Sequence, residues 1–363
     1  MKLGFGIIGC GMIARFHARA IADLAGAKLM GCYSSNPASA DKFAAEFSCK
    51  AHHSLDSMLA DPAISVVTIC TPSGAHLEPC IAAAAAGKHV IVEKPLEITL
   101  KRCDQMIAAC KKAGVLLATI FPSRYHDSSI LMKKAVDQGR FGKLTLGDAY
   151  VKWYRTQQYY DSGAWRGTWQ LDGGGALMNQ AIHSVDLLTW LMGPVTQVTA
   201  HPAMLAHERI AVEDVAVATI QFANGALGVI EASTAVFPGE LKRIELHGTH
   251  GTAVLREEEI TRWEFAKMTA ADQKLVEKMA GNTKTGGGAS DPKAIGHHGH
   301  LRLFKDVASS IRKGTPLSID GSQGRRSVEI ILAIYKSAET GKAVQLPLNS
   351  DPVLKARSKK GKG

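Results

Sequence analysis

Three polar side chains stand out in the apolar stretch from residue 172 to residue 193. At helical spacing, Asn179, His183 and Asp186 fall at i, i+4 and i+7, which places them on one face of a helix. A histidine that titrates near neutral pH can remove the proton of a hydroxyl group. A buried structural network and a metal site on His183 and Asp186 are the alternatives. We expect acid/base work by His183, with Asn179 orienting a hydroxyl and Asp186 fixing or relaying the proton.

A glycine-rich turn near the start of the chain predicts a dinucleotide-binding site. The run from Gly9 to Ala14 reads GCGMIA, follows an apolar strand and opens a helix, which is the context that makes this pattern specific. Its glycines allow a tight turn and close approach to a pyrophosphate, and the helix N-terminus supplies amide donors. A glycine turn without a ligand is the alternative. We expect cofactor contacts from Gly9, Gly11, Met12 and Ile13.

The end of the second strand bears on the choice of cofactor. An acidic residue commonly stands about 20 residues after the glycines and binds the ribose hydroxyls of NAD. Here Ser34, Ser35 and Asn36 occupy that edge, so no carboxylate repels a 2′-phosphate and no adjacent arginine attracts one. We expect Ser34 and Ser35 to contact the adenosine ribose, and the sequence leaves both NAD and NADP open.

A lysine follows another predicted parallel strand. The segment HVIVEKP, residues 89–95, ends in Glu93, Lys94 and Pro95, and the proline biases Lys94 away from helical geometry. Ligands of such sheets bind beyond the carboxyl ends of the strands. Lys94 is either an ordinary exposed lysine or the group that holds a substrate hydroxyl and the nicotinamide ribose and stabilises a developing alkoxide. We expect the second role, with these neighbours lining the same crevice and contacting the cofactor: Thr71, Pro72, His76 and Glu93.

Two further segments offer substrate contacts. Arg124, at the start of the second domain, has the geometry to clamp a carboxylate or a phosphate. The segment before the polar helix contributes Tyr159, Tyr160, Trp165, Arg166 and Trp169. Aromatic rings stack on sugar faces and an arginine pairs with an acidic group, so we expect a substrate lid that includes Trp165 and Arg166. Packing against the sheet is the alternative.

The composition indicates a reduced, globular protein. The 363 residues are 46% hydrophobic and 21% charged, and no apolar run is long enough for a membrane span. The seven cysteines form no CxxC pair and the N-terminus lacks a signal-peptide pattern, so we expect free thiols and a cytoplasmic location. The net charge of +10 owes half its excess to the tail after Pro352, so we expect no nucleic-acid partner. The histidines His297, His298 and His300 lie in a glycine-rich loop, residues 281–300, and we expect no metal there.

The pattern of apolar runs predicts two domains and a tail. Residues 1–121 alternate short apolar runs with helical patterns, which predicts parallel βαβ units in a Rossmann dinucleotide-binding domain. Residues 122–347 begin with a helix, continue with several strand-like pieces and close with two helices. This order predicts an α+β domain on a largely antiparallel sheet. Residues 348–363 form a basic tail.

Several motifs together resemble one family. The segments GIIGCGMIARFH, TPSGAH, AGKHVIVEKP, GGGALMNQAIHSVDLLTWLMG and ILAIYKSAETGKAVQLP are similar, in order and spacing, to the glucose–fructose oxidoreductase / inositol dehydrogenase / MocA family. The resemblance covers residues 3 to 347. It implies NAD(P)-dependent oxidation or reduction of a secondary alcohol in a sugar or sugar derivative. It also implies that the domain of residues 122–347 has an open sheet, binds the substrate and forms a homodimer or homotetramer through that sheet.

The same resemblance implies roles for three residues. Lys94 matches the lysine of the EKP motif, and His183 matches the histidine assigned as acid/base. Asn179 stands where many members carry aspartate, and asparagine here resembles members that act on nucleotide-linked sugars. An inositol or cyclitol dehydrogenase is the alternative enzyme. A dinucleotide-binding sensor without turnover is the alternative of a different class.

Overall fold

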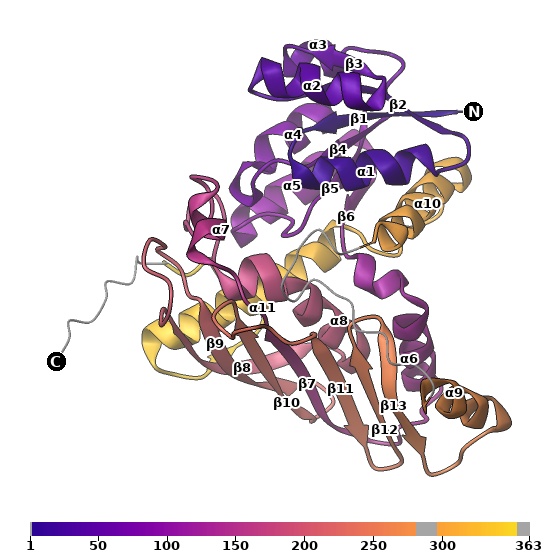
Figure 1. The fold of residues 1–363 in the computed structure, drawn as a ribbon, viewed down its shortest axis with the longest axis vertical. Coiled ribbons are helices and arrows are strands. Elements are labelled where there is room, and N and C mark those ends of the chain that lie inside the picture. The colour runs from indigo at the N-terminus through magenta and orange to yellow at the C-terminus, as the bar shows by residue number, and fades with distance from the viewer. Residues whose placement is uncertain (1, 281–295, 354–363) are drawn as a thin grey trace. The chain divides into compact units, whose positions relative to one another are not determined.

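The computed structural model describes residues 2–280 and 296–353, and the chain divides into two compact units (Figure 1). The first unit is Met1–Pro122 with Gly296–Val328, and the second is Ser123–Ile295 with Glu329–Gly363. The first division falls one residue after the sequence-based boundary at 121. The chain returns to the first unit at Gly296 and leaves it again inside the last long helix, α11 (Gly321–Thr340).

The first unit is a parallel α/β sheet flanked by helices. Its strands are short and apolar, and every residue of the first strand is buried, as expected for a sheet covered on both faces. The strand order is β3-β2-β1-β4-β5-β6, and each pairing is parallel. The elements are β1 (Leu3–Ile8), α1 (Met12–Ala22), β2 (Ala27–Tyr33), α2 (Pro37–Phe47), β3 (Lys50–His52), α3 (Leu55–Leu59), β4 (Val66–Ile69), α4 (Leu77–Ala85), β5 (His89–Val92), α5 (Leu100–Ala113) and β6 (Leu117–Thr119).

The order of these strands fixes where a ligand binds. The chain proceeds outward from β1 to β2 and β3, and then returns to the other side of β1 with β4, β5 and β6. Loops that leave β1 and β4 therefore diverge, and the crevice beyond the carboxyl ends of these strands is the ligand site of a doubly wound sheet. This is the Rossmann arrangement that the sequence predicted.

One helix lies in a different unit from the one expected. Helix α10 (His298–Lys313) packs against α1 in the first unit, although the sequence-based domains assigned it to residues 122–347. Its buried face carries Leu303, Phe304 and Val307, and the Phe304 ring lies 5.8 Å from that of Phe5 on β1. An amphipathic pattern identifies the face that a helix buries, but it does not identify the element that covers this face.

The second unit is built on an eight-stranded sheet of order β13-β12-β11-β7-β10-β9-β8-β14. Within the described sheet every pairing is antiparallel except that of β7 with β10. The expected open, largely antiparallel sheet is confirmed. The elements are α6 (Asp127–Asp137), β7 (Leu144–Lys152), α7 (Gln157–Asp161), the π-helix η3 (Ala176–Ala181), α8 (Ile182–Met192), β8 (Val195–Ala203), β9 (Val215–Phe222), β10 (Leu227–Ser233), β11 (Arg243–Gly248), β12 (Gly251–Arg256), β13 (Glu259–Phe265), α9 (Ala270–Ala280) and β14 (Val344–Gln345).

This sheet has one covered face and one exposed face. Helix α8 packs on β7 and β11, and α6 packs on β12, on the same side of the sheet (Figure 1). Strand β9 alternates buried and exposed residues along its length, so Ala218 and Ile220 face the helices whereas Val217 and Thr219 face outward. Such alternation is typical of an antiparallel sheet with one face in water.

Among the described residues, no helix has the length and apolar character needed to cross a bilayer. All seven cysteines are free thiols, as the sequence predicted. Most of the basic tail and of the glycine-rich loop, residues 354–363 and 281–295, lies outside the described residues.

Candidate active site

The glycine turn after β1 has the shape of a pyrophosphate cradle. Gly9 has a φ of +93°, and a Cβ there would lie 2.8 Å from the Cys70 carbonyl group, so only glycine fits this turn. A Cβ on Gly11 would meet nothing within 4 Å, and this N-cap of α1 offers no side-chain cap to the first amides. The exposed helix N-terminus therefore keeps donors and space for an anion. Met12 is exposed and Ile13 half-buried beside them.

Two polar residues that follow β2, Ser34 and Asn36, make hydrogen bonds within their own segment. The Oδ1 atom of Asn36 accepts the amide of Ser39 and caps α2, while the hydroxyl of Ser34 accepts the amide of Asn36 at 3.2 Å. Ser35 is exposed. The described edge holds no carboxylate, as the sequence indicated.

Glu93 faces the interior of the first unit instead of a cofactor. Its Oε1 atom lies 2.7 Å from Nε2 of His17, and its Oε2 atom accepts the amide of Lys94 at 3.1 Å. Burial raises the pKa of Glu93, but hydrogen bonds from His17 and His300 outweigh burial and hold this pKa well below its usual range. Burial lowers the pKa of His17, so the neutral ring donates to Glu93 and accepts the Thr68 hydroxyl at 2.7 Å. The sequence predicts a cofactor contact for Glu93, whereas in the structure its side chain is buried and holds the main chain of Lys94.

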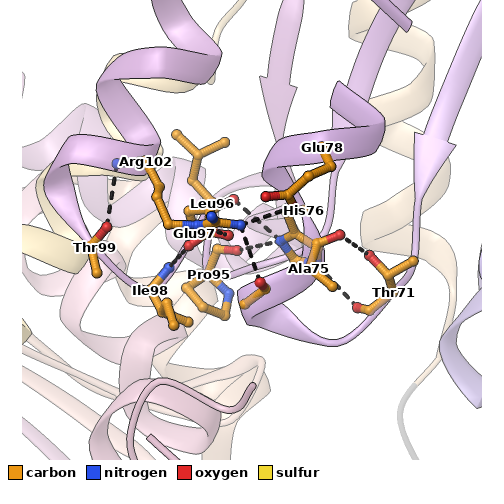
Figure 2. Close-up of polar contacts among 11 residues, drawn as sticks. Thr71, Ala75, His76, Glu78, Pro95, Leu96, Glu97, Ile98, Thr99 and Arg102 are labelled. Carbon is orange, nitrogen blue, oxygen red and sulfur yellow. Dashed lines mark hydrogen bonds and ion pairs between the residues drawn. The ribbon is translucent and has the colours of Figure 1, made fainter. Parts of the chain in front are cut away.

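His76 likewise holds neighbouring parts of the main chain in place. Its Nδ1 atom lies 3.0 Å from the Pro95 carbonyl oxygen, and its Nε2 atom lies 3.0 Å from the Thr71 carbonyl oxygen (Figure 2). The ring is 1% exposed, so it joins the loops after β4 and β5 from inside rather than lining a crevice. Figure 2 also shows Arg102 beside Glu97, with Nε 2.8 Å from Oε1. Lys94 is half-buried between buried neighbours, and Thr71 and Pro72 are half-buried too.

The polar helix begins as a π-helix, which changes the expected spacing. Residues 176–181 are π-helical and the α-helix starts at Ile182, so the regular i, i+4, i+7 face does not hold. A carboxylate anchors the start of this segment, because Glu213 accepts the amides of Gly175 and Leu177 at 3.1 and 2.9 Å. A Cβ on Gly175 would lie 1.8 Å from the Glu213 carbonyl oxygen, which explains the glycine. π-Helical turns are frequent at functional sites.

Asn179 and His183 differ from their neighbours in exposure. From residue 172 to residue 189 every residue is buried except these two, which are half-buried. Asn179 is oriented from both ends of its amide: Nδ2 donates to Asp172, and Oδ1 accepts from Nε2 of Gln180 at 3.1 Å. The carboxamide therefore has a defined orientation on the same segment as His183.

Asp186 and Arg124 are each other's partners. Nε of Arg124 lies 2.7 Å from Oδ2 of Asp186, and Nη2 lies 2.6 Å from Oδ1, with the two residues 6% and 0% exposed. The sequence predicts a substrate anion as the partner of Arg124 and a role for Asp186 with the proton of His183. A bidentate, buried ion pair is instead the geometry of structural support.

The aromatic segment divides into a packed half and an open half. Tyr160 packs with Ile210 and Val212, and its hydroxyl lies 2.8 Å from that of Thr234, so it belongs to the core. Trp169 is partly buried against the same cluster.

In the open half the Arg166 guanidinium lies 4.2 Å from the Tyr159 ring centroid and 4.5 Å from that of Trp165. All three side chains are half-buried. This group keeps the features expected of a sugar-binding segment.

The three C-terminal histidines do not form one cluster. His297 lies 2.7 Å from Asp23, whereas His300 lies 3.7 Å from Glu93. Groups with metal-ligand composition in the described residues are His17 with Glu93 and His300, and Asp148 with Glu245 and His247. The 2.7 Å contact between His17 and Glu93 is a hydrogen bond, because ligands of one zinc ion lie about 3.3 Å apart. We assign no metal to either group.

Sequence reasoning missed the residues that position the helix. Glu213, Asp172 and Gln180 are all buried, and Glu213 lies two residues before β9 with nothing local in the sequence to mark it. Asp172 precedes three glycines and Gln180 adjoins Asn179, so their places before and within the polar helix were the only available indication. Their partners are distant in sequence or set by the π-helix, which a 3.6-residue period does not reveal.

Two family models match the chain. Residues 3–121 match the model described as an oxidoreductase family with an NAD-binding Rossmann fold, and residues 130–254 match the GFO/IDH/MocA C-terminal domain.

Known proteins match over almost the whole chain. The myo-inositol 2-dehydrogenase of Thermotoga maritima is 28% identical over 94% of this chain and 98% of its own. The crystal structure of the WlbA dehydrogenase from Bordetella pertussis, in complex with NADH and UDP-GlcNAcA, has a TM-score of 0.88 and 35% identity, covering 96% of this chain and 99% of its own. A levoglucosan dehydrogenase in complex with NADH and levoglucosan has a TM-score of 0.83 and 27% identity, covering 96% of this chain and 100% of its own.

Proposed function

This chain belongs to the GFO/IDH/MocA oxidoreductase family, and we propose that Lys94, His183 and Asn179 carry its reaction on a nucleotide-linked sugar. The chain is an NAD(P)-dependent oxidoreductase acting on a sugar or sugar derivative. The observation that carries the residue assignment is the exposure of Asn179 and His183 within an otherwise buried helix.

The proposed reaction divides its work among three side chains. A nicotinamide cofactor held at the end of β1 would supply the hydride chemistry at the carbon of the substrate alcohol. His183 removes the hydroxyl proton as that hydride leaves, and Lys94 stabilises the negative charge that develops on the oxygen. Asn179 cannot take a proton, and it orients the hydroxyl through its fixed carboxamide.

The cofactor fits the residues at the end of β1. Gly9 and Gly11 would hold the pyrophosphate against the N-terminus of α1, with Met12 and Ile13 beside it. Ser34 and Ser35 would face the adenosine ribose, and Thr71 and Pro72 would line the same edge of the sheet. NAD and NADP both fit an edge without a carboxylate.

The finer substrate class rests on two points. Asparagine at 179 resembles family members that act on nucleotide-linked sugars, and WlbA carries such a ligand in its structure. Trp165 and Arg166 would contact the sugar. A cyclitol is the alternative substrate, and it is favoured by the likeness to myo-inositol 2-dehydrogenase.

The test begins with binding and continues with turnover. Fluorescence titration with NADH and NADPH separately measures each affinity, and a panel of cyclitols, free sugars and nucleotide sugars is then followed by absorbance at 340 nm. Turnover of a nucleotide sugar supports the proposal. Turnover of inositol alone would contradict the substrate class, and cofactor binding without any turnover would favour a sensor.

Assembly and location are also proposals. The outward face of the eight-stranded sheet exposes Val217 and Leu227, which are 43% and 54% exposed, and we assign it to a homodimer or homotetramer. The free cysteines support a reducing, cytoplasmic location.

A further inference from the structure

Three cysteine thiols form a hydrogen-bonded row beside the glycine turn that follows β1. Cys10 lies between Gly9 and Gly11, and its side chain is half-buried. The Cys10 thiol is hydrogen-bonded to that of Cys32 on β2. Cys32 is hydrogen-bonded in turn to Cys49, which lies just before β3. The row therefore begins at the proposed pyrophosphate cradle and runs toward the edge strand of the first sheet.

One carbonyl group connects the Cys10 side chain to the main chain of the turn. Sγ of Cys10 donates to the Tyr33 carbonyl oxygen at 3.6 Å, and the same oxygen accepts the Gly9 amide at 2.8 Å. The glycines on both sides of Cys10 allow its main chain to follow a movement of its side chain. A bond that draws the Cys10 sulfur toward Cys32 would therefore displace the turn.

Cys10 is the thiol of this row that loses its proton most readily. The hydrogen bond from Cys32 lowers the pKa of Cys10 and outweighs burial, which raises it, and the positive charge of Arg15 lowers it further. The same hydrogen bond raises the pKa of Cys32 to about 12. Cys10 also directly precedes the N-cap of α1, and helix N-termini stabilise thiolates. Cys10 is therefore a nucleophile beside a protonated thiol, which is the arrangement of a redox-sensitive cysteine with a resolving partner.

The first thiol of the row is also the accessible one. Cys10 is half-buried, whereas Cys32 is 0% exposed, so a small solute meets Cys10 before it meets Cys32. A Cβ on the neighbouring Gly11 would meet nothing within 4 Å, and Met12 is 42% exposed. A dinucleotide bound against the N-terminus of α1 would fill this space and cover Cys10.

From this arrangement we propose that Cys10 and Cys32 are a modification site for hydroperoxides, at which a disulfide between the two residues prevents dinucleotide binding. The oxidant is hydrogen peroxide or an organic hydroperoxide small enough to enter the cradle. Bound dinucleotide protects the pair, so only protein without its cofactor reacts with the oxidant. The inference depends on the cofactor site and not on the identity of the sugar substrate.

The reaction takes two steps and consumes one hydrogen peroxide molecule. In the first step the Cys10 thiolate attacks one peroxide oxygen, the O–O bond breaks, and the other oxygen leaves as hydroxide and is protonated to water. Cys10 is then a sulfenic acid. In the second step the Cys32 sulfur loses its proton and attacks the Cys10 sulfur, the S–O bond breaks, and a second water molecule leaves. The two thiols together lose two electrons, which reduce the peroxide to water.

Peptide mapping identifies the bond directly. The reduced full-length protein is treated with hydrogen peroxide, its remaining thiols are alkylated, and it is digested with trypsin without reductant. Cleavage after lysine and arginine places Cys10 in residues 3–15, Cys32 in residues 29–42 and Cys49 in residues 43–50. We expect a disulfide that joins the first two peptides. A disulfide that joins the second and third peptides instead, or no disulfide within the row, overturns the proposal.

A second thiol pair is the internal control. Sγ of Cys80 lies 3.8 Å from Sγ of Cys110, but the two residues are 0% and 2% exposed. We expect them to stay reduced under conditions that join Cys10 to Cys32. Equal oxidation of the two pairs overturns the proposal, because contact between thiols would then be sufficient for reaction.

Fluorescence titration measures the effect on the cofactor site. We expect the affinity for NADH or NADPH, whichever the reduced protein binds more tightly, to fall about tenfold or more after oxidation, because the displaced turn no longer holds the pyrophosphate. Dithiothreitol should restore this affinity. An unchanged affinity of the disulfide-linked protein overturns the proposal.

Protection by the dinucleotide is measured on the same reaction. At about twenty times its Kd the dinucleotide leaves about one molecule in twenty unbound, so it should slow formation of the disulfide about twentyfold. Equal rates of oxidation with and without dinucleotide overturn the proposal.

Two alanine variants separate the disulfide from other oxidation. Cys32→Ala removes the resolving thiol, so its dinucleotide affinity after peroxide treatment should stay within about threefold of its reduced value. Cys110→Ala is the matched control, because it removes another buried thiol that contacts a cysteine, and it should respond to peroxide like the original chain. A loss of affinity in Cys32→Ala as large as that in the original chain overturns the proposal.

The measurements separate the thiol pair from the cofactor site. The peptide map requires neither a variant nor a bound dinucleotide, so it tests the disulfide even if Cys32→Ala does not fold. Failure of the reduced protein to bind either dinucleotide would contradict the cofactor site, and with it the proposed effect of the disulfide on binding.

Discussion

The guanidinium of Arg124 and the carboxylate of Asp186 form a parallel, two-bond ion pair that water does not reach. This pair joins the start of the second unit to the middle of α8, three residues after His183. The pair therefore holds the polar helix in place and does not contact the substrate.

Removing one member of this pair should destabilise the second unit. Asp186→Ala leaves a buried, uncompensated guanidinium, which costs about 3–5 kcal/mol. Urea unfolding measures the loss. Asp161→Ala, which breaks the exposed pair with Arg209, is the control and should cost much less, because solvent screens this pair. Equal losses in the two variants would contradict a special role for the buried pair.

Asn179→Asp tests the contact with Asp172. Because Asn179 donates to Asp172, an aspartate at 179 places two carboxyl groups in contact, and one of them must keep a proton. We expect the variant to fold but to lose about 2 kcal/mol of stability relative to the original chain as the pH rises from about 5 to about 8. Thermal unfolding at the two pH values measures this.

A control for charge alone is available in the first unit. Asn36→Asp changes an exposed N-cap of α2, where aspartate is an equally good cap, and it should leave stability nearly unchanged. A pH-independent result for Asn179→Asp would show that the Asp172 contact is not made in solution.

The stability that Glu213 gives to the start of the polar helix should depend on pH. Burial raises the pKa of Glu213 to about 7, so the folded chain holds this proton more tightly than the unfolded chain. The resulting stability is complete below pH about 4 and is lost as the pH rises through about 7. Glu213→Gln removes this titration, so the melting temperature of the original chain should fall relative to the variant between pH about 5.5 and about 8.5. If the melting temperatures of the two proteins change in parallel with pH, Glu213 does not titrate in this range.

The exposed edge of β2 should control cofactor choice. Ser35→Asp places a carboxylate where the adenosine ribose would lie, which repels a 2′-phosphate but accepts ribose hydroxyls. We expect NADPH affinity to fall about tenfold or more while NADH affinity stays within a few-fold. Equal changes in the NADH and NADPH affinities would show that the adenosine ribose does not bind beside Ser35.

The sequence predicted the two sheets well because their information is local. Continuous apolar runs mark the buried strands of the first sheet, and alternation marks β9 on the half-covered second sheet. The cradle at Gly9 and Gly11 was also predictable, since it depends on adjacent residues. The position of α10 was not predictable, because the apolar face of a helix does not indicate which element it packs against.

The inward-facing supports were harder to predict than the exposed candidates. Glu93 and His76 have the residue types of site residues, yet each is occupied by hydrogen bonds to residues distant in sequence. The π-helix at residues 176–181 changes the spacing of Asn179 from His183, and Asp186 pairs with Arg124. Such pairings depend on tertiary contacts that no single-sequence period contains.

The role of His183 and Lys94 is tested most directly by single-turnover rates with the substrate found in the screen. His183→Ala and Lys94→Ala should each slow cofactor reduction about 100-fold or more, while NADH affinity by fluorescence titration stays within a few-fold. His298→Ala, an exposed histidine of α10, is the control and should react at the original rate. Near-original single-turnover rates in His183→Ala would contradict the account, because the proton would then leave by another route.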